Sequence, residues 1–528
     1  MDEANTTLPE LPQEQWPSWS ETLRSQITFD GIGRYVSELP PLVLDTGEHR
    51  LPDKLVKSLL KSLEITGPFT QKGKRSTKHR TVFAHQREKI KAAVLSCHEA
   101  IDEDSSRAFG RALIELWRSN RFSQELRWCA WGAGVFGDDV TALEIFELMR
   151  EFQRKDGKFW YYSSIDLLEV LKSLDSDMAR MTLSYYANQG RSKMQRETKT
   201  FIDNQVQALE ISREEYEDRI VPTCKLDERG TRALDFGGRV FGVAVGENFY
   251  PTLRSEEGKL YKSMPKKRSE DDARAYAKAK DDWEYLRKGL VHVFRVQSQR
   301  LEALMIDGRR WSFEDWEQYI HHHPLMLLFA RNLLWGVYDA EGNLERCFRV
   351  AMDNTLADIA DDLFELPENA IVGLPHPLEM TTERRQRWGD VFLDYELIAP
   401  FEQLGRPTFS PEDEETSPAA RLAGQEGSPR QARTHLKYHG YSRADAYGMA
   451  TWHSRTLSNR HIRICIELSP GLEIGSYEND GPQRIRAIDF RALNGKSIDL
   501  EKVDPVAFSE GILDARSIVS GVLEDASE

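Results

Sequence analysis

The sequence predicts a mainly helical α+β protein, in which antiparallel helices come first and a mixed α/β domain with an antiparallel sheet follows. Apolar residues recur at helical spacing through residues 53–221, which is typical of amphipathic helices. Short stretches of alternating apolar and polar residues appear after them, and these favour strands. The balance of 40% hydrophobic and 30% charged residues allows a sizeable core. The chain of 528 residues is long enough for roughly two to four domains.

The first half of the chain is expected to be an arm followed by helical repeats. Residues 1–52 are rich in proline, tryptophan and polar residues, which predicts a variable, loosely ordered arm with a short ordered piece near residues 27–44. Leu55, Leu59 and Leu63 then share one helical face, and similar signals continue through residues 53–221 in segments of roughly 12 to 16 residues. This organisation is typical of HEAT-type solenoids, in which each helix pair buries its apolar stripe against the next. An irregular helical bundle is the alternative, because the pairs carry no clear repeat consensus.

The second half is expected to be one α/β domain interrupted by a linker. In residues 222–405, short strands precede a long helix that Asp272 caps. Residues 406–433 contain four prolines, an acidic run and several glycines and serines, which predicts a flexible linker. Residues 434–528 are expected to be the β-rich part of the same domain. Apolar and polar residues alternate over 462–468, which predicts a half-buried strand.

Charge and composition exclude several classes of protein. The net charge of −15 argues against broad binding to nucleic acid. The N-terminus lacks the basic and apolar regions of a signal peptide, and no apolar run approaches the ~20 residues of a membrane helix. Five scattered cysteines fit a reducing compartment better than a disulfide framework. We therefore expect a cytoplasmic protein with no membrane or nucleic-acid partner.

Motifs for catalysis, cofactors and metals do not withstand scrutiny, so we expect no cofactor, and the catalytic residues are unknown. The sequence Gly495-Lys496-Ser497 imitates the end of a phosphate-binding loop, but Phe490 stands where that loop needs a glycine. His321, His322 and His323 are adjacent, yet a metal site needs converging ligands and neighbouring side chains diverge. We interpret the three histidines as a polar turn at a helix end and predict no metal site there.

An ordered series of short motifs runs through the second half of the chain. The motifs are Arg219-Ile-Val-Pro222, Leu226-Asp-Glu-Arg-Gly230, Leu234-Asp-Phe-Gly237, Met264-Pro265, Gln299-Arg-Leu-Glu302, Arg309-Arg-Trp311, His323-Pro324, Gly373-Leu-Pro-His-Pro377, Trp388, Asp394-Tyr-Glu-Leu397, Pro400-Phe-Glu-Gln-Leu404, Arg406 and Val506-Ala-Phe-Ser-Glu510. As a set they resemble the large C-terminal domain of unknown function in bacterial proteins called molybdate metabolism regulators. The resemblance covers roughly residues 200–528.

That resemblance has implications for domain content and partners. Members of the family often carry HEAT-like helices and a Trp-Gly-Arg domain before this region. No Trp-Gly-Arg tripeptide occurs in this sequence, so the chain resembles a short version without that module. Relatives are thought to work beside AAA+ ATPases of the MoxR type and von Willebrand A proteins. The resemblance therefore implies protein partners, and an adaptor or effector role in a multi-protein bacterial system.

Eight polar residues within these motifs form the candidate polar site, since polar residues in otherwise apolar motifs must be paired or solvated. They are Arg300, Glu302, Arg309, His323, His376, Asp394, Glu396 and Arg406. A buried arginine–carboxylate network is one interpretation, and a functional polar pocket is the other. Because side chains at positions i and i+2 of a helix point in different directions, Arg300 and Glu302 need partners elsewhere. We expect at least one arginine–carboxylate pair between their helix and residues 394–406.

We expect the chain to be an intracellular binding and regulatory scaffold of unknown pathway. The first alternative is an enzyme whose polar pocket lies in residues 222–528, and the second is a nucleic-acid-linked factor. The enzyme is favoured if His323, His376 and Glu302 converge with Asp394 in one cleft. The scaffold is favoured if these residues lie apart or pair off inside a core.

Overall fold

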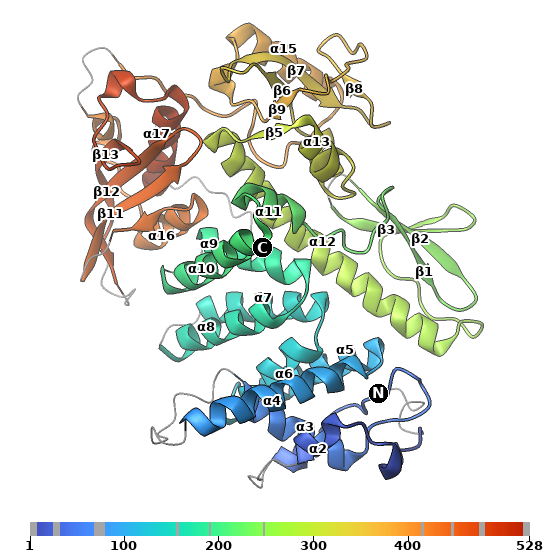
Figure 1. Ribbon diagram of the computed structural model, residues 1–528. Helices are drawn as coiled ribbons and strands as arrows, with labels where there is room; N and C mark the ends of the chain where they lie inside the picture. Colours follow the sequence, from blue (N-terminus) through green and yellow to red (C-terminus); the bar gives the residue numbers. More distant parts are fainter. Residues whose placement is uncertain are drawn as a thin grey trace. The chain divides into compact units, whose positions relative to one another are not determined.

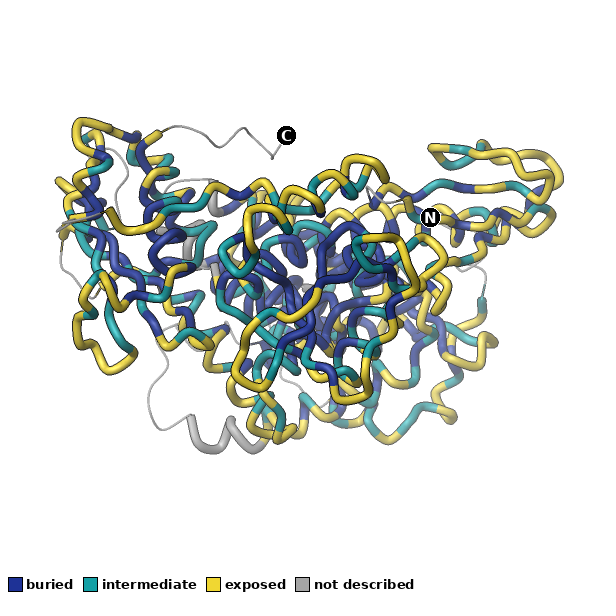
Figure 2. Tube along the Cα trace, turned by 90° about the horizontal axis from the view of Figure 1, so that it is seen from above, coloured by how far each residue is buried: buried dark blue, intermediate teal, exposed yellow. Residues whose placement is uncertain are grey.

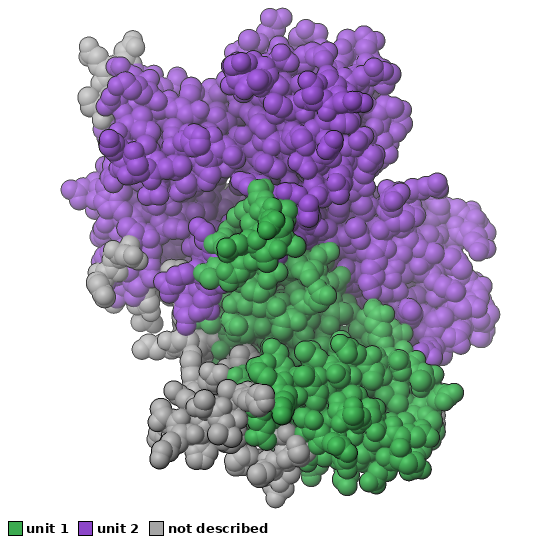
Figure 3. Space-filling model, in the orientation of Figure 1, with its two compact units in different colours: residues 1–184, 200–213 green, residues 185–199, 214–528 purple. Residues whose placement is uncertain are grey.

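The computed structural model describes most of the chain, with its elements labelled in Figure 1. The described residues are 8–24, 32–67, 80–154, 158–189, 192–246, 249–412, 417–444, 448–474 and 481–520. The chain divides into two compact units, shown in Figure 3. Unit 1 comprises residues 1–184 and 200–213, and unit 2 comprises residues 185–199 and 214–528. The predicted fold class is confirmed, because helices dominate the first part and antiparallel sheets follow.

Unit 1 is built mainly of helices. They are η1 (Gln13–Gln15), α2 (Trp19–Arg24), η2 (Ile32–Glu38), α3 (Asp53–Thr66), α4 (Arg80–Glu99), α5 (Glu103–Ser119), η5 (Gln124–Leu126), α6 (Trp128–Phe136), α7 (Asp139–Arg154) and α8 (Lys158–Ser173), with parts of α9 (Asp177–Gln189) and α10 (Ser192–Leu209). Helices that follow one another, such as α5 and α6 or α7 and α8, pack side by side and form the layers seen in Figure 1. Leu55, Leu59 and Leu63 of α3 are fully buried, as their helical spacing predicts.

Part of the segment expected to be a loose arm is packed in the structure. Leu23, Leu42 and Leu51 are buried. The backbone amide of Val43 donates a hydrogen bond of 2.8 Å to the Ser105 hydroxyl of α5. Leu42 and Val43 belong to the short piece that was expected to be ordered, whereas the burial of Leu23 and Leu51 differs from the expected loose arm. These leucines are buried because they cover apolar surface of the first helices. Residues 1–7 and 25–31 lie outside the described part of the chain.

Unit 2 also contains helices. They are α11 (Arg213–Arg219), α12 (Ala273–Asp307), α13 (Phe313–Trp316), the π-helical turn η6 (Glu317–His321), α14 (Met326–Arg331), η7 (Pro377–Glu379), α15 (Thr382–Asp394), η8 (Pro418–Leu422), α16 (Pro429–Tyr438), η9 (Leu500–Lys502) and α17 (Pro505–Ser520). The Asp272 side chain accepts a hydrogen bond from the Ala275 amide, so it caps α12 as predicted. None of the helices in the described ranges combines the length and hydropathy that a membrane span requires.

The strands described in unit 2 form three sheets, and their strand pairs are antiparallel. The first has the order β1-β2-β3-β4, from β1 (Thr231–Asp235), β2 (Val240–Val245), β3 (Pro251–Ser255) and β4 (Leu260–Tyr261). The second has the order β5-β9-β6-β7-β8, from β5 (Arg310–Ser312), β6 (Trp335–Tyr338), β7 (Leu344–Val350), β8 (Leu356–Ala357) and β9 (Ile371–Gly373). The third has the order β10-β11-β12-β13, from β10 (Ser442–Arg443), β11 (Met449–Leu457), β12 (Ile462–Glu473) and β13 (Arg484–Ala492).

Burial along the strands follows the two-residue period of a pleated sheet. In β2, Phe241 and Val243 are buried, whereas Gly242 and Ala244 are exposed. In β12, Ile462, Ile464 and Ile466 are buried, in agreement with the strand predicted there. Buried positions in Figure 2 therefore run along the inner faces of the sheets and helices.

The stretch predicted to be a flexible linker, residues 406–433, is packed where it is described. It contains η8 and the first turn of α16, and Pro418, Ala419 and Leu422 of η8 are buried. The prediction was wrong for these residues because their few apolar side chains find a core. Pro429 stands at the first position of α16. A backbone amide at that position would have no hydrogen-bond partner within the helix, so proline is tolerated there. Residues 413–416 of the acidic run lie outside the described part.

Candidate functional site

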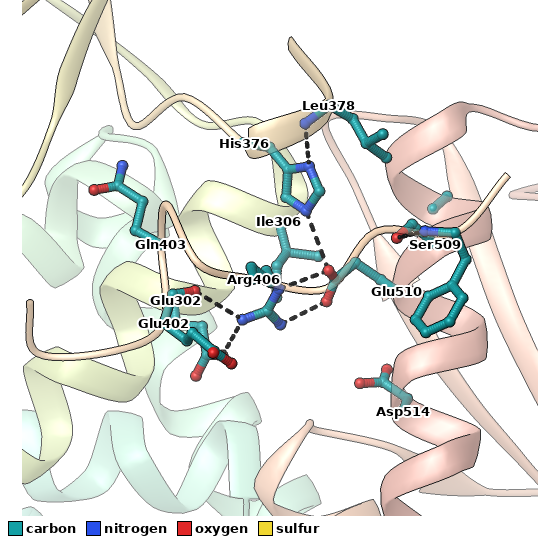
Figure 4. Close-up of polar contacts among 12 residues, drawn as sticks. Glu302, Ile306, His376, Leu378, Glu402, Gln403, Arg406, Ser509, Glu510 and Asp514 are labelled. Atoms are coloured by element: carbon teal, nitrogen blue, oxygen red, sulfur yellow. Dashed lines mark hydrogen bonds and ion pairs between the residues drawn. The ribbon is translucent and has the colours of Figure 1, made fainter. Parts of the chain in front are cut away.

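The Arg406 side chain is the centre of a buried polar cluster in unit 2, shown in Figure 4. Only 3% of this side chain is exposed. Its Nε and Nη2 atoms each donate a 2.7 Å hydrogen bond to Glu510 of α17, and its Nη1 atom donates one of 2.7 Å to Glu302 of α12. The guanidinium therefore binds the Glu510 carboxylate through two parallel hydrogen bonds and the Glu302 carboxylate through one. This arrangement ties the 406 segment to two helices at once.

His376 completes the cluster from the loop before η7. Its Nδ1 atom accepts a 3.2 Å hydrogen bond from the Leu378 amide, so the ring proton lies on Nε2. Nε2 is 3.1 Å from Glu510 Oε1 and donates to it. The His376 side chain is fully buried. The ring is therefore a fixed donor that orients the Glu510 carboxylate.

Burial and pairing act in opposite directions on the charges of this cluster. Burial by itself would raise the pKa of Glu510, but hydrogen bonds from Arg406 and His376 outweigh it and hold that pKa below its usual range. Burial would likewise lower the pKa of Arg406, but the two carboxylates outweigh it and raise that pKa. The hydroxyl of Tyr438 donates a 3.0 Å hydrogen bond to the other oxygen of Glu302. The charged forms of Glu510 and Arg406 are therefore the stable ones at neutral pH.

A second carboxylate, Asp514, lies one helical turn after Glu510 on α17. Its Oδ2 atom accepts hydrogen bonds from the Tyr441 hydroxyl at 2.9 Å and from Arg455 Nη1 at 3.2 Å. Asp514 is fully buried, and the Arg455 side chain is 8% exposed. Since positions i and i+4 share a helix face, α17 presents two buried carboxylates to two buried arginines. This pattern locks α17 into the unit.

Arg300 and Arg309 belong to a separate cluster around Asp218 of α11. Arg300 forms an ion pair with Asp218 and lies 3.5 Å from Glu217. Arg309 Nη2 is 3.8 Å from Asp218, whose Oδ2 atom also accepts a 2.9 Å hydrogen bond from the Trp311 indole. Burial would lower the pKa of Arg300, but the charges of Asp218 and Glu217 outweigh it and raise that pKa. This cluster therefore connects α11 to α12 through Arg300 and to β5 through Trp311.

The pair predicted between the long helix and residues 394–406 is present, since Glu302 bonds to Arg406. Its helix neighbour Arg300 instead pairs with α11, which the prediction did not include. The side chains of Arg300 and Glu302 therefore reach different partners, as their i, i+2 spacing on α12 predicts.

Three of the eight predicted residues lie outside both clusters. The Nδ1 atom of His323 accepts hydrogen bonds of 3.2 Å from the amides of Leu325 and Met326, and its Nε2 atom lies 3.1 Å from the Val221 carbonyl oxygen. His323 thus caps the start of α14. Asp394, at the end of α15, and Glu396, in the left-handed region with φ +53°, are both exposed.

The arrangement separates the residues that an enzyme site would have brought together. His376 and Glu302 meet through Arg406 and Glu510, whereas His323 caps a helix and Asp394 is exposed. The residues that do meet are buried and paired with one another.

Sequence reasoning missed the carboxylates that complete the clusters. Glu510 ends one of the quoted motifs, and Asp218 directly precedes another. An acidic residue in an apolar helix such as α17 was the available signal, since it needs a buried cation. Nothing in the sequence indicated which of the many arginines would supply it, because Arg406 and Glu510 are 104 positions apart.

A pocket of about 420 Å³ lies beside the end of α15. Its lining residues are Gly389, Phe392, Ala399, Phe401, Glu402, Gln403, Leu404 and Gly405. The buried Gln403 side chain accepts a 2.9 Å hydrogen bond from the Leu334 amide and donates one of 3.0 Å to the Leu334 carbonyl. The Gln403 side chain therefore pairs with the backbone of Leu334, directly before β6, as a neighbouring strand would. These bonds fix the part of the pocket lining that contains Gln403.

Potential metal ligands gather at a different place in unit 2. Among the residues that the structure describes, one group of three is Glu317, His321 and His322, whose ligand atoms lie within 4.8 Å of one another. Adjacent histidines were expected to diverge. His323 does turn away to Val221, but His321 and His322 stay together.

Comparisons with known proteins find relatives without an assigned function. Residues 258–441 match the family described as "Domain of unknown function (DUF4132)". The chain is 28% identical over 416 residues to "Uncharacterized protein YehI" of Escherichia coli strain K12, which covers 77% of this chain. The chain spans only 33% of the length of that relative. No solved structure shows a significant match. Neither the family match nor the match to YehI concerns molybdate, so a link to molybdate regulators stays a prediction. Residues 258–441, which include Glu302, His376 and Arg406, are therefore similar to a domain family of unknown function.

Proposed function

We propose that this chain is a protein-binding scaffold, acting as an adaptor or effector in a larger bacterial assembly. The observation that carries the proposal is the pairing of the candidate polar residues inside the core. Arg406, Glu302 and Glu510 satisfy one another, and so do Arg300 and Asp218. Buried side chains that are paired in this way hold helices together, and they face one another instead of a substrate.

Exposed apolar residues beside the α15 pocket add support. Leu393 is 77% exposed and Ile398 is 83% exposed, and Tyr395 lies between them. Single exposed apolar residues are ordinary, but several in one short segment beside a pocket are typical of a surface that binds another protein. We call Leu393, Tyr395 and Ile398 the α15 apolar segment.

The α15 apolar segment is held rigidly, which favours binding because little order is lost on association. The Tyr395 hydroxyl donates a 2.6 Å hydrogen bond to Asp361, and the Arg349 guanidinium lies 4.0 Å from its ring centroid. The Ile398 amide donates a 3.2 Å hydrogen bond to Asn332 Oδ1. A core that includes Trp388 and Phe392 lies beneath the segment.

The test is purification of the tagged chain from its native host, with and without ATP, followed by mass spectrometry. ATP is included because the resemblance implies an AAA+ partner. The variant is Leu393→Glu combined with Ile398→Glu, and the matched control is Leu260→Glu, which changes a 59% exposed leucine of β4.

We expect the same proteins to copurify with the wild type and the control. The recovered amount of these proteins should fall at least tenfold with the double variant. The purified partner should then bind the wild-type chain in a two-component assay. Equal recovery with the double variant would place binding elsewhere, and no enriched protein under either condition would contradict the scaffold proposal.

A further inference from the structure

The π-helical turn η6 brings three potential metal ligands together. The His322 amide donates a 2.8 Å hydrogen bond to the Glu317 carbonyl, which is the i to i+5 bond of a π turn. This wider turn places His321 and His322, four and five positions after Glu317, on the same side of the helix as Glu317. As a result the ligand atoms of Glu317, His321 and His322 all lie within 4.8 Å of one another. Single π turns inside helices occur frequently at functional sites.

The His321 ring is already oriented as a ligand would need to be. It stacks on Trp316, with centroids 5.2 Å apart and planes 15° apart. Its Nε2 atom lies 2.9 Å from the Asn354 carbonyl oxygen. A carbonyl oxygen can only accept, so Nε2 carries the proton and Nδ1 keeps the lone pair. Histidines that bind metals almost always donate their other ring N–H to such an acceptor.

Two charged side chains, those of Arg331 and Glu317, lie near His321. Arg331 is directed to Asn354, because its Nη2 atom donates a 2.6 Å hydrogen bond to the Asn354 side-chain oxygen. The Glu317 carboxylate supplies a negative charge within the ligand group itself.

We propose that Glu317, His321 and His322 bind a divalent transition-metal ion of the Zn²⁺ type. Two imidazoles and one carboxylate are ligands that zinc accepts in proteins. Bonds of about 2.0 to 2.2 Å would require the ligand atoms to move closer together than they are now. The exposed His322 and the half-buried Glu317 have room for that rotation. The remaining coordination position would be open to water or to a ligand from a partner.

The histidine that follows them is not part of this site. Both ring nitrogens of His323 are engaged, by the amides at the start of α14 and by the Val221 carbonyl. The competing explanation is a polar turn that stacks on Trp316 and binds nothing. The two explanations differ in one property, which is saturable metal binding that depends on His322.

The test is calorimetric titration of the metal-free full chain with ZnSO₄ at pH 7.5. We expect one saturable site whose affinity falls at least tenfold in His322→Ala and in Glu317→Gln. The matched controls are Glu314→Gln, which changes an exposed acid on α13, and His461→Asn, which changes an exposed histidine at φ +56°. Asparagine tolerates that backbone conformation. Both controls should bind zinc like the wild type.

Thermal melting of each metal-free variant shows whether it is folded. If Glu317→Gln melts early, the exposed His322→Ala variant decides the question alone. The absence of a saturable site in the wild type would overturn the proposal. So would a folded His322→Ala variant that binds zinc with wild-type affinity, because the ion would then lie elsewhere.

Discussion

Replacing Arg406 by alanine is expected to destabilise unit 2 strongly. The change removes three charge-assisted hydrogen bonds of 2.7 Å and leaves Glu302 and Glu510 buried without their cation. Removing one partner of a buried ion pair costs about 3 to 5 kcal/mol, since the remaining charge is stranded. Only the bonds from His376 and Tyr438 stay in place. At about 1.4 kcal/mol per tenfold change, the equilibrium for opening should rise roughly a hundredfold or more.

The pH dependence of this cost gives a second, independent check. In the wild type the pKa of Glu510 is lowered from 4.5, so its contribution is fully present above about pH 4.5 and is lost as pH falls below it. Wild-type stability from this group should therefore be constant between pH 7 and pH 5. Without Arg406, burial is expected to raise the pKa of Glu510, so protonation on acidification relieves the stranded charge. The difference between Arg406→Ala and the wild type should shrink from pH 7 to pH 5.

Hydrogen exchange of the α17 amides in the full chain measures this effect, because α17 carries Glu510. A suitable control is Arg484→Ala, which breaks a pair whose arginine side chain is 66% exposed. Exposed pairs contribute about 0 to 1 kcal/mol, so the control should exchange almost like the wild type. The reasoning would be refuted if Arg406→Ala left α17 exchange unchanged, or if its cost grew on acidification.

Two further substitutions and one labelling experiment test other parts of the structure. Arg300→Ala should cost about 3 to 5 kcal/mol by stranding Asp218, and thermal melting should show it, whereas an unchanged melting temperature would mean that the Asp218 cluster adds little. Gln403→Ala should cost about 1 to 3 kcal/mol, because it leaves the Leu334 amide and carbonyl without their partner; faster exchange of that amide is the measurement, and normal exchange would contradict it. The five cysteines are all buried, and burial raises the pKa of Cys347 to about 12, so thiol reagents at pH 7.5 should label the folded chain slowly and the unfolded chain fully. Rapid labelling of folded chain would show that the cores open easily.

The local elements of this protein could be predicted from residue spacing and residue type. The spacing of Leu55, Leu59 and Leu63 identified a helix, and the alternation in residues 462–468 identified a strand. Asp272 marked the start of α12. These features depend on contacts between residues a few positions apart, so they can be read from spacing and residue type alone. The mainly helical α+β class follows from their sum.

The pairing of the polar residues, in contrast, could not be predicted before the fold was known. His323 and His376 stand in similar motifs, each followed by proline, yet one caps a helix and the other orients Glu510. Arg406 opens a stretch that reads as a linker by composition, but Glu510 and Glu302 hold it in the core. Each of these partners is 104 positions away from Arg406. Pairing over such distances depends on where helices and loops cross in space, and local spacing carries no record of that crossing.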